Sequence, residues 1–222
     1  WKIDINDIKS KMDEKVKLLV LINPNNPTGN VASEEQVSEL IEIASNYPKC
    51  TIISDEIYDG LDFSDSFKST ASISPKSPVI TLNGVSKVFF APGWRIGYMA
   101  WHDPKNQLSH VRDGVERLLR SRLCASSPAQ FGYLAGIQGS KEYLKENYSR
   151  ILRRLDYSMK RISEINGIEC HRPGGAFYLF VKITKSIYSN DDKKFVLDLL
   201  HKKHVLVVHG SGFSPEFGKG HF

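Results

Sequence analysis

Hydrophobic residues along the chain form short runs that alternate with longer amphipathic stretches. The run at 17–22 is almost continuously apolar and stops at Asn23-Pro24. Such a run suits a strand of a parallel sheet that is buried on both faces, because a surface strand would alternate apolar and polar residues. Three further strands are predicted from the runs at 51–54, 79–82 and 96–100.

Helical spacing and capping signals surround these strands. Ile5, Ile8 and Met12 recur at intervals of three and four residues, which predicts an N-terminal helix. Ser33 with Gln36 three residues later forms a capping box that opens a second helix. The alternation of strand and helix predicts an α/β fold, a doubly wound and mostly parallel sheet with helices on both faces, in which ligands lie beyond the carboxyl ends of the strands.

The second half of the chain changes to long amphipathic helices. Helices are predicted at 107–120, from Ser127-Pro128 onwards, and at 141–165, where Gly167 stops the last one. We expect a smaller α+β domain at 140–222, following the part of a large domain at 1–139. Its predicted elements are strands at 168–171, 176–183 and 205–208 and a helix capped by Asp191.

Composition describes an ordinary soluble globular chain. It has 222 residues, a formal charge of +5 and 41% hydrophobic residues. No apolar run approaches the roughly 18 residues needed to span a bilayer, and no secretory signal pattern opens the chain, so we expect a cytoplasmic protein without a membrane partner. Basic residues stand beside acidic ones, as at 141–146, rather than in a basic block, so no nucleic-acid partner is predicted.

Cysteines and histidines give little sign of a metal or disulfide. Cys50, Cys124 and Cys170 are odd in number and widely separated, which supports neither a disulfide framework nor a zinc site. They are expected to be reduced, packed thiols. His201 and His204 lie about one helical turn apart, but no third ligand accompanies them, so a solvated helix end is favoured and no metal site is predicted.

Candidate chemistry gathers where the predicted strands end. Asn26, Asp55 and Lys87 each follow or end a parallel strand, and Tyr58 comes three residues after Asp55. A lysine among small and apolar residues can lose its proton and act as a nucleophile. Each residue also has a structural explanation. Asn26 can form a turn, Asp55 can cap a helix, and Tyr58 and Lys87 can be a packed aromatic and a surface lysine. Their combination indicates a cofactor site.

Four motifs extend this pattern over the whole chain, and they are 23–29 (NPNNPTG), 54–58 (SDEIY), 86–98 (SKVFFAPGWRIGY) and 174–178 (GGAFY). In this order and spacing they resemble the class I and II aminotransferases of the fold-type I pyridoxal-phosphate enzymes. The resemblance implies the second half of the large cofactor domain followed by the small domain. It also implies pyridoxal 5′-phosphate as cofactor.

The resemblance assigns a role to five residues. Lys87 would hold the cofactor covalently and then move a proton at the substrate α-carbon. Asp55 would pair with the pyridine nitrogen, and Tyr58 and Asn26 would hydrogen-bond the 3′-oxygen of the ring, with Asn26 also near the substrate carboxylate. Arg95 offers a planar fork for the phosphate.

Two departures from the family pattern limit what this chain is expected to do alone. Many members carry a serine phosphate donor at the position of Gly84, for which Ser86 is a candidate substitute. The family's N-terminal half is absent, and the arginine that binds the substrate carboxylate would follow Phe222. We therefore expect an inactive piece of a homodimeric aminotransferase that acts on an amino acid and a 2-oxo acid.

The substrate prediction uses three further segments. Those at 89–94, 122–131 and 207–213 are most similar to alanine aminotransferases of archaeal type, which favours L-alanine with 2-oxoglutarate over L-aspartate. Two alternatives stay open. One is a pyridoxal-phosphate-dependent carbon–sulfur lyase, and the other is the cofactor-sensing half of a transcription regulator with an upstream DNA-binding module.

Overall fold

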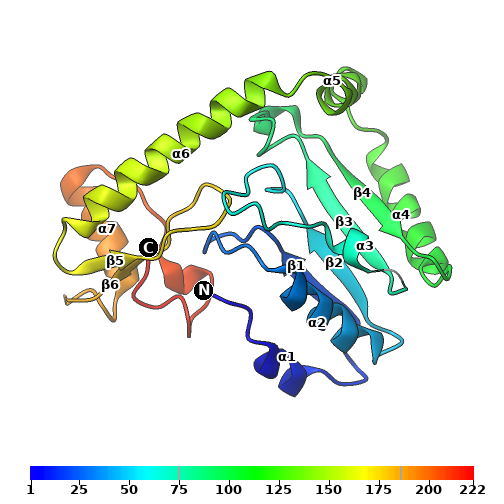
Figure 1. The fold of residues 1–222 in the computed structure, drawn as a ribbon, viewed down its shortest axis with the longest axis horizontal. Coiled ribbons are helices and arrows are strands. Elements are labelled where there is room, and N and C mark those ends of the chain that lie inside the picture. Colours follow the sequence, from blue (N-terminus) through cyan, green and yellow to red (C-terminus); the bar gives the residue numbers. More distant parts are fainter. Residues whose placement is uncertain (75, 186) are drawn as a thin grey trace.

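The computed structural model describes residues 1–74, 76–185 and 187–222 (Figure 1). The described helices are α1 (Ile5–Lys11), α2 (Glu34–Ser45), α3 (Thr70–Ile73), α4 (Ser109–Arg122), α5 (Ser127–Gln138), α6 (Glu142–Ser163) and α7 (Asp192–Lys203). The described strands are β1 (Leu18–Ile22), β2 (Thr51–Asp55), β3 (Val79–Gly84), β4 (Gly97–His102), β5 (Ile168–Cys170) and β6 (Val181–Ile183). Pro92–Trp94 and Gly210–Gly212 are short 3-10 turns.

The larger sheet has the strand order β1-β2-β3-β4. The first three strands are parallel, and β4 is antiparallel to β3. In this register Ile22 lies opposite Asp55, and Asp55 lies opposite Leu82. The prediction of an α/β fold with a mostly parallel sheet is confirmed, and the carboxyl ends of β1, β2 and β3 meet at one edge.

The main core lies between this sheet and α2. The capping box forms as predicted, because the Ser33 hydroxyl accepts the Gln36 amide at 3.3 Å and the Gln36 side chain accepts the Ser33 amide at 3.2 Å. From that start α2 buries Val37 and Leu40 against Ile52 of β2. Full burial of each such side chain stabilises the fold by roughly 1.5–3 kcal/mol. The sheet whose carboxyl edge carries the predicted site is therefore stabilised by its packing against α2.

Strand β1 differs from its prediction. Leu21 faces the core at 7% exposure, whereas Leu18 and Val20 are 53% and 61% exposed. The expectation of burial on both faces is wrong for this chain, because β1 is an edge strand and α2 covers only the face that Leu21 shares. An unbroken apolar run shows that both faces of a strand can be buried. Whether they are buried depends on which other elements pack against them.

Helix α6 leads from the sheet to the C-terminal part of the chain. It runs for 22 residues from the end of α5 to the β5–β6 hairpin (Figure 1). Gly167 follows it with a φ of +99°, a conformation that favours glycine. Asp191 caps α7 as predicted, since its side chain accepts the Lys194 amide at 3.0 Å.

Two strands predicted in the C-terminal part are wrong in extent or existence. The strand expected at 176–183 is reduced to β6, because the first part of this stretch leaves the strand conformation at Ala176, with a φ of +59°, and bonds instead to the Leu61 carbonyl. The strand expected at 205–208 is absent from the described structure. The edges of β6 are occupied by β5 on one side and by Phe222 on the other, where Val181 and Phe222 exchange two backbone bonds of 2.9 Å.

The described cysteines are all free, but they are not all packed. Cys50 is buried, Cys170 is intermediate and Cys124 is exposed. The expectation of a packed thiol is wrong for Cys124, which follows Leu123, itself 85% exposed, in the loop after α4. Among the described helices, none combines the length and the apolar character that crossing a membrane would require.

Candidate active site

Three sequence-predicted site residues lie at the carboxyl edge of the parallel strands. Asp55 is the last residue of β2, Asn26 follows β1 and Lys87 follows β3. The Asp55 carbonyl accepts the Asn23 amide at 3.0 Å, and its carboxylate accepts the Ile57 amide at 3.2 Å. These bonds fix the carboxylate at the point where the chain leaves the sheet.

The turn after β1 is held by its own side chains. Asn25 Oδ1 accepts the Thr28 hydroxyl at 2.7 Å and the Thr28 amide at 3.2 Å. Gly29 has a φ of +65°, and a Cβ there would meet Pro173. Asn23 is buried, and its Oδ1 accepts the Ala32 amide at 2.9 Å. The polar residues of this motif therefore build the turn that carries Asn26.

Tyr58 is the most buried of the five predicted residues, at 3% exposure. Its hydroxyl lies 2.6 Å from the Tyr178 hydroxyl. Burial raises the pKa of Tyr58 first, and the Tyr178 hydroxyl and the Asp55 charge add to the rise, while a hydrogen bond from the Asn26 side chain opposes it. Tyr58 is therefore a neutral phenol at pH 7, and both Asn26 and Asp55 lie close enough to shift its pKa.

Lys87 lies over two aromatic rings, those of Tyr58 and Phe177. Its Nζ is 5.7 Å from the centroid of the Tyr58 ring and 5.6 Å from the centroid of the Phe177 ring. Both distances are within the range in which an ammonium group is attracted to a ring face. The structure thus places Lys87 beside Tyr58, with Asn26 and Asp55 close enough to shift the pKa of Tyr58, and the roles of the four residues stay predictions.

Arg95 does not join this group. Its side chain is exposed and donates through Nη1 to the Pro92 carbonyl at 2.8 Å. It lines a separate cavity of about 590 Å³ with Arg122 and Ser126. Within the described chain, no hydrogen bond or ring contact links Arg95 to the other four residues. The role of Arg95 at a phosphate stays a prediction.

Sequence reasoning gave no role to Phe177 and Tyr178, although it quoted both within a motif. The segment that carries them docks on the sheet rim, because the amides of Gly174 and Gly175 both donate to the Gly29 carbonyl at 2.9 Å. The Ala176 amide donates to the Leu61 carbonyl at 2.8 Å. The two glycines ahead of the two aromatic residues in this motif could have indicated a role for Phe177 and Tyr178. Only the docked position of the segment shows which residues these aromatics contact.

Glu56, the neighbour of Asp55, points away from this group into the protein. It is 3% exposed, and its Oε1 accepts the Ser54 hydroxyl at 2.9 Å and the Thr70 amide at 2.9 Å. The Ser69 hydroxyl adds a bond of 3.1 Å. Burial raises the pKa of Glu56, while these bonds lower it less. Glu56 ties the end of β2 to the start of α3.

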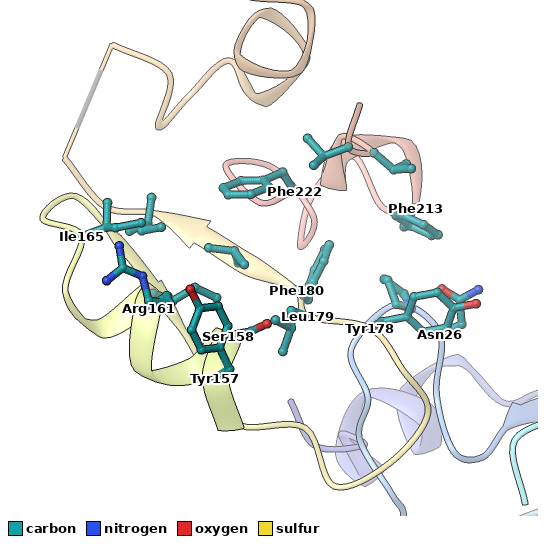
Figure 2. A pocket seen from close by; sticks show the side chains of 16 residues that line it. Asn26, Tyr157, Ser158, Arg161, Ile165, Tyr178, Leu179, Phe180, Phe213 and Phe222 are labelled. Carbon is teal, nitrogen blue, oxygen red and sulfur yellow. The ribbon is translucent and has the colours of Figure 1, made fainter. Parts of the chain in front are cut away.

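A cavity of about 710 Å³ opens beside Asn26 and Tyr178. Figure 2 shows these two side chains at one end and Arg161 of α6 at the other, with Phe213 and Phe222 of the C-terminal segment opposite. The lining is mostly apolar with a few polar groups, which is usual for small-molecule sites. The cavity thus meets the predicted site at Asn26.

The chemistry of this group can be compared with the cofactor that the sequence predicts. Pyridoxal phosphate presents an aldehyde, a ring hydroxyl and a ring nitrogen. The structure supplies an amine at Lys87, a phenol and an amide at Tyr58 and Asn26, and a carboxylate at Asp55. The residues present therefore fit the ring of the cofactor.

The family comparison gives the class of protein. The model of the family "Aminotransferase class I and II" matches residues 1–220, so the chain belongs to this family. Enzymes of the family depend on pyridoxal phosphate, and the α/β fold described above is theirs.

Individual similar proteins carry more specific names than the family as a whole. The chain is 39% identical over 219 residues to the glutamate-pyruvate aminotransferase AlaA of Haemophilus influenzae, covering 96% of this chain and 54% of that protein. It is 38% identical over 218 residues to an alanine aminotransferase of Mycobacterium tuberculosis, covering 96% of this chain and 51% of the relative. A solved alanine aminotransferase from Pyrococcus furiosus superposes with a TM-score of 0.95 at 49% identity, over 100% of this chain and 56% of that one. The chain spans about half the length of these relatives.

Proposed function

We propose that the whole protein is a pyridoxal-phosphate-dependent aminotransferase that exchanges the amino group between L-alanine and 2-oxoglutarate. The observation that supports this most directly is the position of Lys87 over Tyr58, whose hydroxyl also meets Asn26 and lies near Asp55. The printed names of the similar proteins support alanine as the amino donor. Aspartate is the second substrate candidate.

Each side chain then has a task. The cofactor, when bound, supplies an electron sink for the bond that breaks at the substrate α-carbon. Lys87 attaches the cofactor and afterwards carries the proton removed from that carbon. Asp55 holds a proton on the ring nitrogen by its negative charge. Tyr58 and Asn26 bind the ring oxygen, and Arg95 is proposed to bind the phosphate.

Covalent labelling tests the assignment of Lys87. The protein is incubated with pyridoxal phosphate, reduced with borohydride and digested, and the modified lysine is identified by mass spectrometry. We expect the label on Lys87, unchanged in a Lys49→Ala control because Lys49 is exposed and precedes the amino end of β2, opposite the end that carries Asp55, and lost in Lys87→Ala. Label spread over surface lysines with none concentrated at Lys87 would contradict the proposal.

Specificity constants test the substrate. In the whole protein kcat/KM is compared for alanine, aspartate and tyrosine with 2-oxoglutarate as acceptor. A preference for aspartate or tyrosine would overturn the choice of alanine. Release of pyruvate and ammonia from a cysteine-type substrate without an acceptor would instead identify a lyase.

A homodimeric, cytoplasmic protein is part of the same proposal. Large apolar side chains stand exposed on α4 and α5, with Leu118 at 73%, Leu119 at 57% and Phe131 at 73%. Large exposed apolar side chains are typical of interaction surfaces. Light scattering of the whole protein should give twice the mass of one chain, and the proposed domains 1–139 and 140–222 should separate on limited proteolysis near residue 140.

A further inference from the structure

Tyr178 received no role from the sequence, although it makes a direct contact with the site. Its hydroxyl lies 2.6 Å from that of Tyr58, and the two rings meet edge to face with centroids 5.6 Å apart. Phe177 packs on Tyr58 in the same geometry, also at 5.6 Å. Two consecutive residues of one segment therefore pack against the Tyr58 ring.

The hydrogen-bond capacity of a phenol gives this contact a consequence. A tyrosine hydroxyl has one proton to donate and two lone pairs that accept. Either hydroxyl of the pair can be the donor. Tyr58 donating to Tyr178 is the arrangement that raises the pKa of Tyr58, and the reverse arrangement becomes available when the ring oxygen of the cofactor offers Tyr58 another acceptor. When Tyr178 and the Asn26 amide both donate to Tyr58, the Tyr58 proton is free for an acceptor on the ring of the cofactor. Successive hydrogen bonds in such a chain polarise one another and strengthen the last donor.

We propose that Tyr178 is a positioning residue for Tyr58, donating to its hydroxyl so that Tyr58 directs its own proton at the ring oxygen of pyridoxal phosphate. This inference rests on the proposed function, because it requires the cofactor at Lys87. It adds a residue from the C-terminal part of the chain to a site that otherwise consists of residues at the sheet rim.

The docking of the segment that carries Tyr178 fixes the position of the Tyr178 hydroxyl. Gly174 and Gly175 both bond to Gly29, and a Cβ on Gly175 would approach Pro24 and the Leu61 carbonyl to 2.9 Å. The backbone therefore has little room to shift along the rim. The Tyr178 hydroxyl reaches Tyr58 only while this segment is docked, so the strength of the Tyr58 donor follows the position of the segment.

The test measures the protonation of the Lys87 nitrogen after it has joined the cofactor. In the whole protein loaded with pyridoxal phosphate, the visible absorbance changes with pH at a midpoint that a hydrogen bond to the ring oxygen lowers. Tyr178→Phe should raise this midpoint by about 0.5–1 pH unit, as expected for the loss of one neutral hydrogen bond. Tyr58→Phe should raise it at least as far.

Two further variants separate positioning from a general structural effect. The double variant Tyr58→Phe/Tyr178→Phe should have the midpoint of Tyr58→Phe alone, because Tyr178 acts through Tyr58. Tyr143→Phe, an exposed tyrosine on α6, should leave the midpoint of the wild type unchanged.

The outcomes also separate this inference from the proposed function. A wild-type midpoint in Tyr178→Phe, or a shift that persists in the Tyr58→Phe background, overturns the role of Tyr178. A wild-type protein that shows no Lys87-dependent absorbance overturns the proposed function itself. Both results are read from absorbance, independently of turnover.

Discussion

Asp55 ends β2 with its carboxylate held by the Ile57 amide and its carbonyl held by the Asn23 amide. The next residue, Glu56, is turned into the protein and bonded to Ser54 and Thr70. Two adjacent acids thus have opposite surroundings, because successive side chains of a strand point to opposite faces. At the scale of residues, one acid lies at the proposed site and the other stabilises the end of β2.

Replacing Asp55 by Asn tests the first of these roles. The amide keeps the size of the side chain but removes the charge that holds a proton on the ring nitrogen. In the whole protein, cofactor binding should persist while kcat for alanine falls by about 10²–10³. Steady-state kinetics measure this, and Asp113→Asn on the exposed face of α4 is the control. Near-normal turnover in Asp55→Asn would remove the residue from the mechanism.

The pH dependence of stability tests the role of Glu56. Burial raises the pKa of Glu56 above the usual 4.5. Between pH 4.5 and the pKa in the folded chain, the folded chain therefore holds a proton that the unfolded chain has lost. The contribution of Glu56 to the free energy of unfolding must therefore fall as pH rises from about 4.5 through the folded pKa. Glu56→Gln, which keeps an accepting oxygen, should remove this fall.

Urea unfolding at several pH values between 4 and 8 measures the difference between wild type and Glu56→Gln. Glu42→Gln on the exposed face of α2 should follow the wild-type curve, since Glu42 is exposed and free of such burial. Parallel curves for wild type and Glu56→Gln would mean that the carboxyl does not carry the raised pKa.

At the scale of elements, the segment from Pro173 to Tyr178 connects the two parts of the chain. It touches the turn after β1 through Gly29 and the loop after Tyr58 through Leu61. Glycine is required where these backbones approach closely, because a Cβ on Gly175 would lie 2.8 Å from Val31 and 2.9 Å from Pro24. The motif with two glycines is therefore an interface between elements rather than a flexible link.

Gly175→Ala should loosen this interface. The added methyl group overpacks a tight contact, and we expect a loss of about 1–3 kcal/mol in the free energy of unfolding. Gly114→Ala is a matched control, because nothing lies within 4 Å of its Cβ position in helix α4. It should stabilise the chain by about 0.5–1 kcal/mol through helix propensity. Equal effects of the two substitutions in urea unfolding would contradict the close approach at Gly175.

At the scale of the whole molecule, the chain exposes surfaces that its apolar pattern would bury. Leu18 and Val20 of β1 and Leu118 of α4 are more than half exposed. The chain also spans 51–56% of the length of the similar proteins quoted above. The group at the sheet rim comprises the residues proposed to bind the ring of the cofactor, and Arg95 lies outside that group.

These features predict that the 222-residue chain alone does not transaminate at rates typical of enzymes, whereas the whole protein does. The formation of pyruvate from alanine and 2-oxoglutarate, followed with a coupled dehydrogenase, measures both. Turnover by the isolated chain equal to that of the whole protein would show that these residues suffice for catalysis.

The sequence by itself determined the four strands of the larger sheet, the longer helices and the residues at the strand ends. Apolar runs and the Ser33–Gln36 capping box are local patterns, and local patterns set local structure. Since β1, β2 and β3 are parallel, their carboxyl ends meet at one edge, which brings Asn26, Asp55 and Lys87 together.

Tertiary structure decided which groups meet across the chain. The contact of Tyr58 with Tyr178 joins residues 120 positions apart, and no periodicity in either segment encodes it. The exposure of Val20 and the missing strand at 205–208 depend on which elements lie alongside, because a strand forms or is covered only where a neighbour offers hydrogen bonds or apolar surface. The direction of Arg95, bonded to Pro92 within its own turn, was decided in the same way.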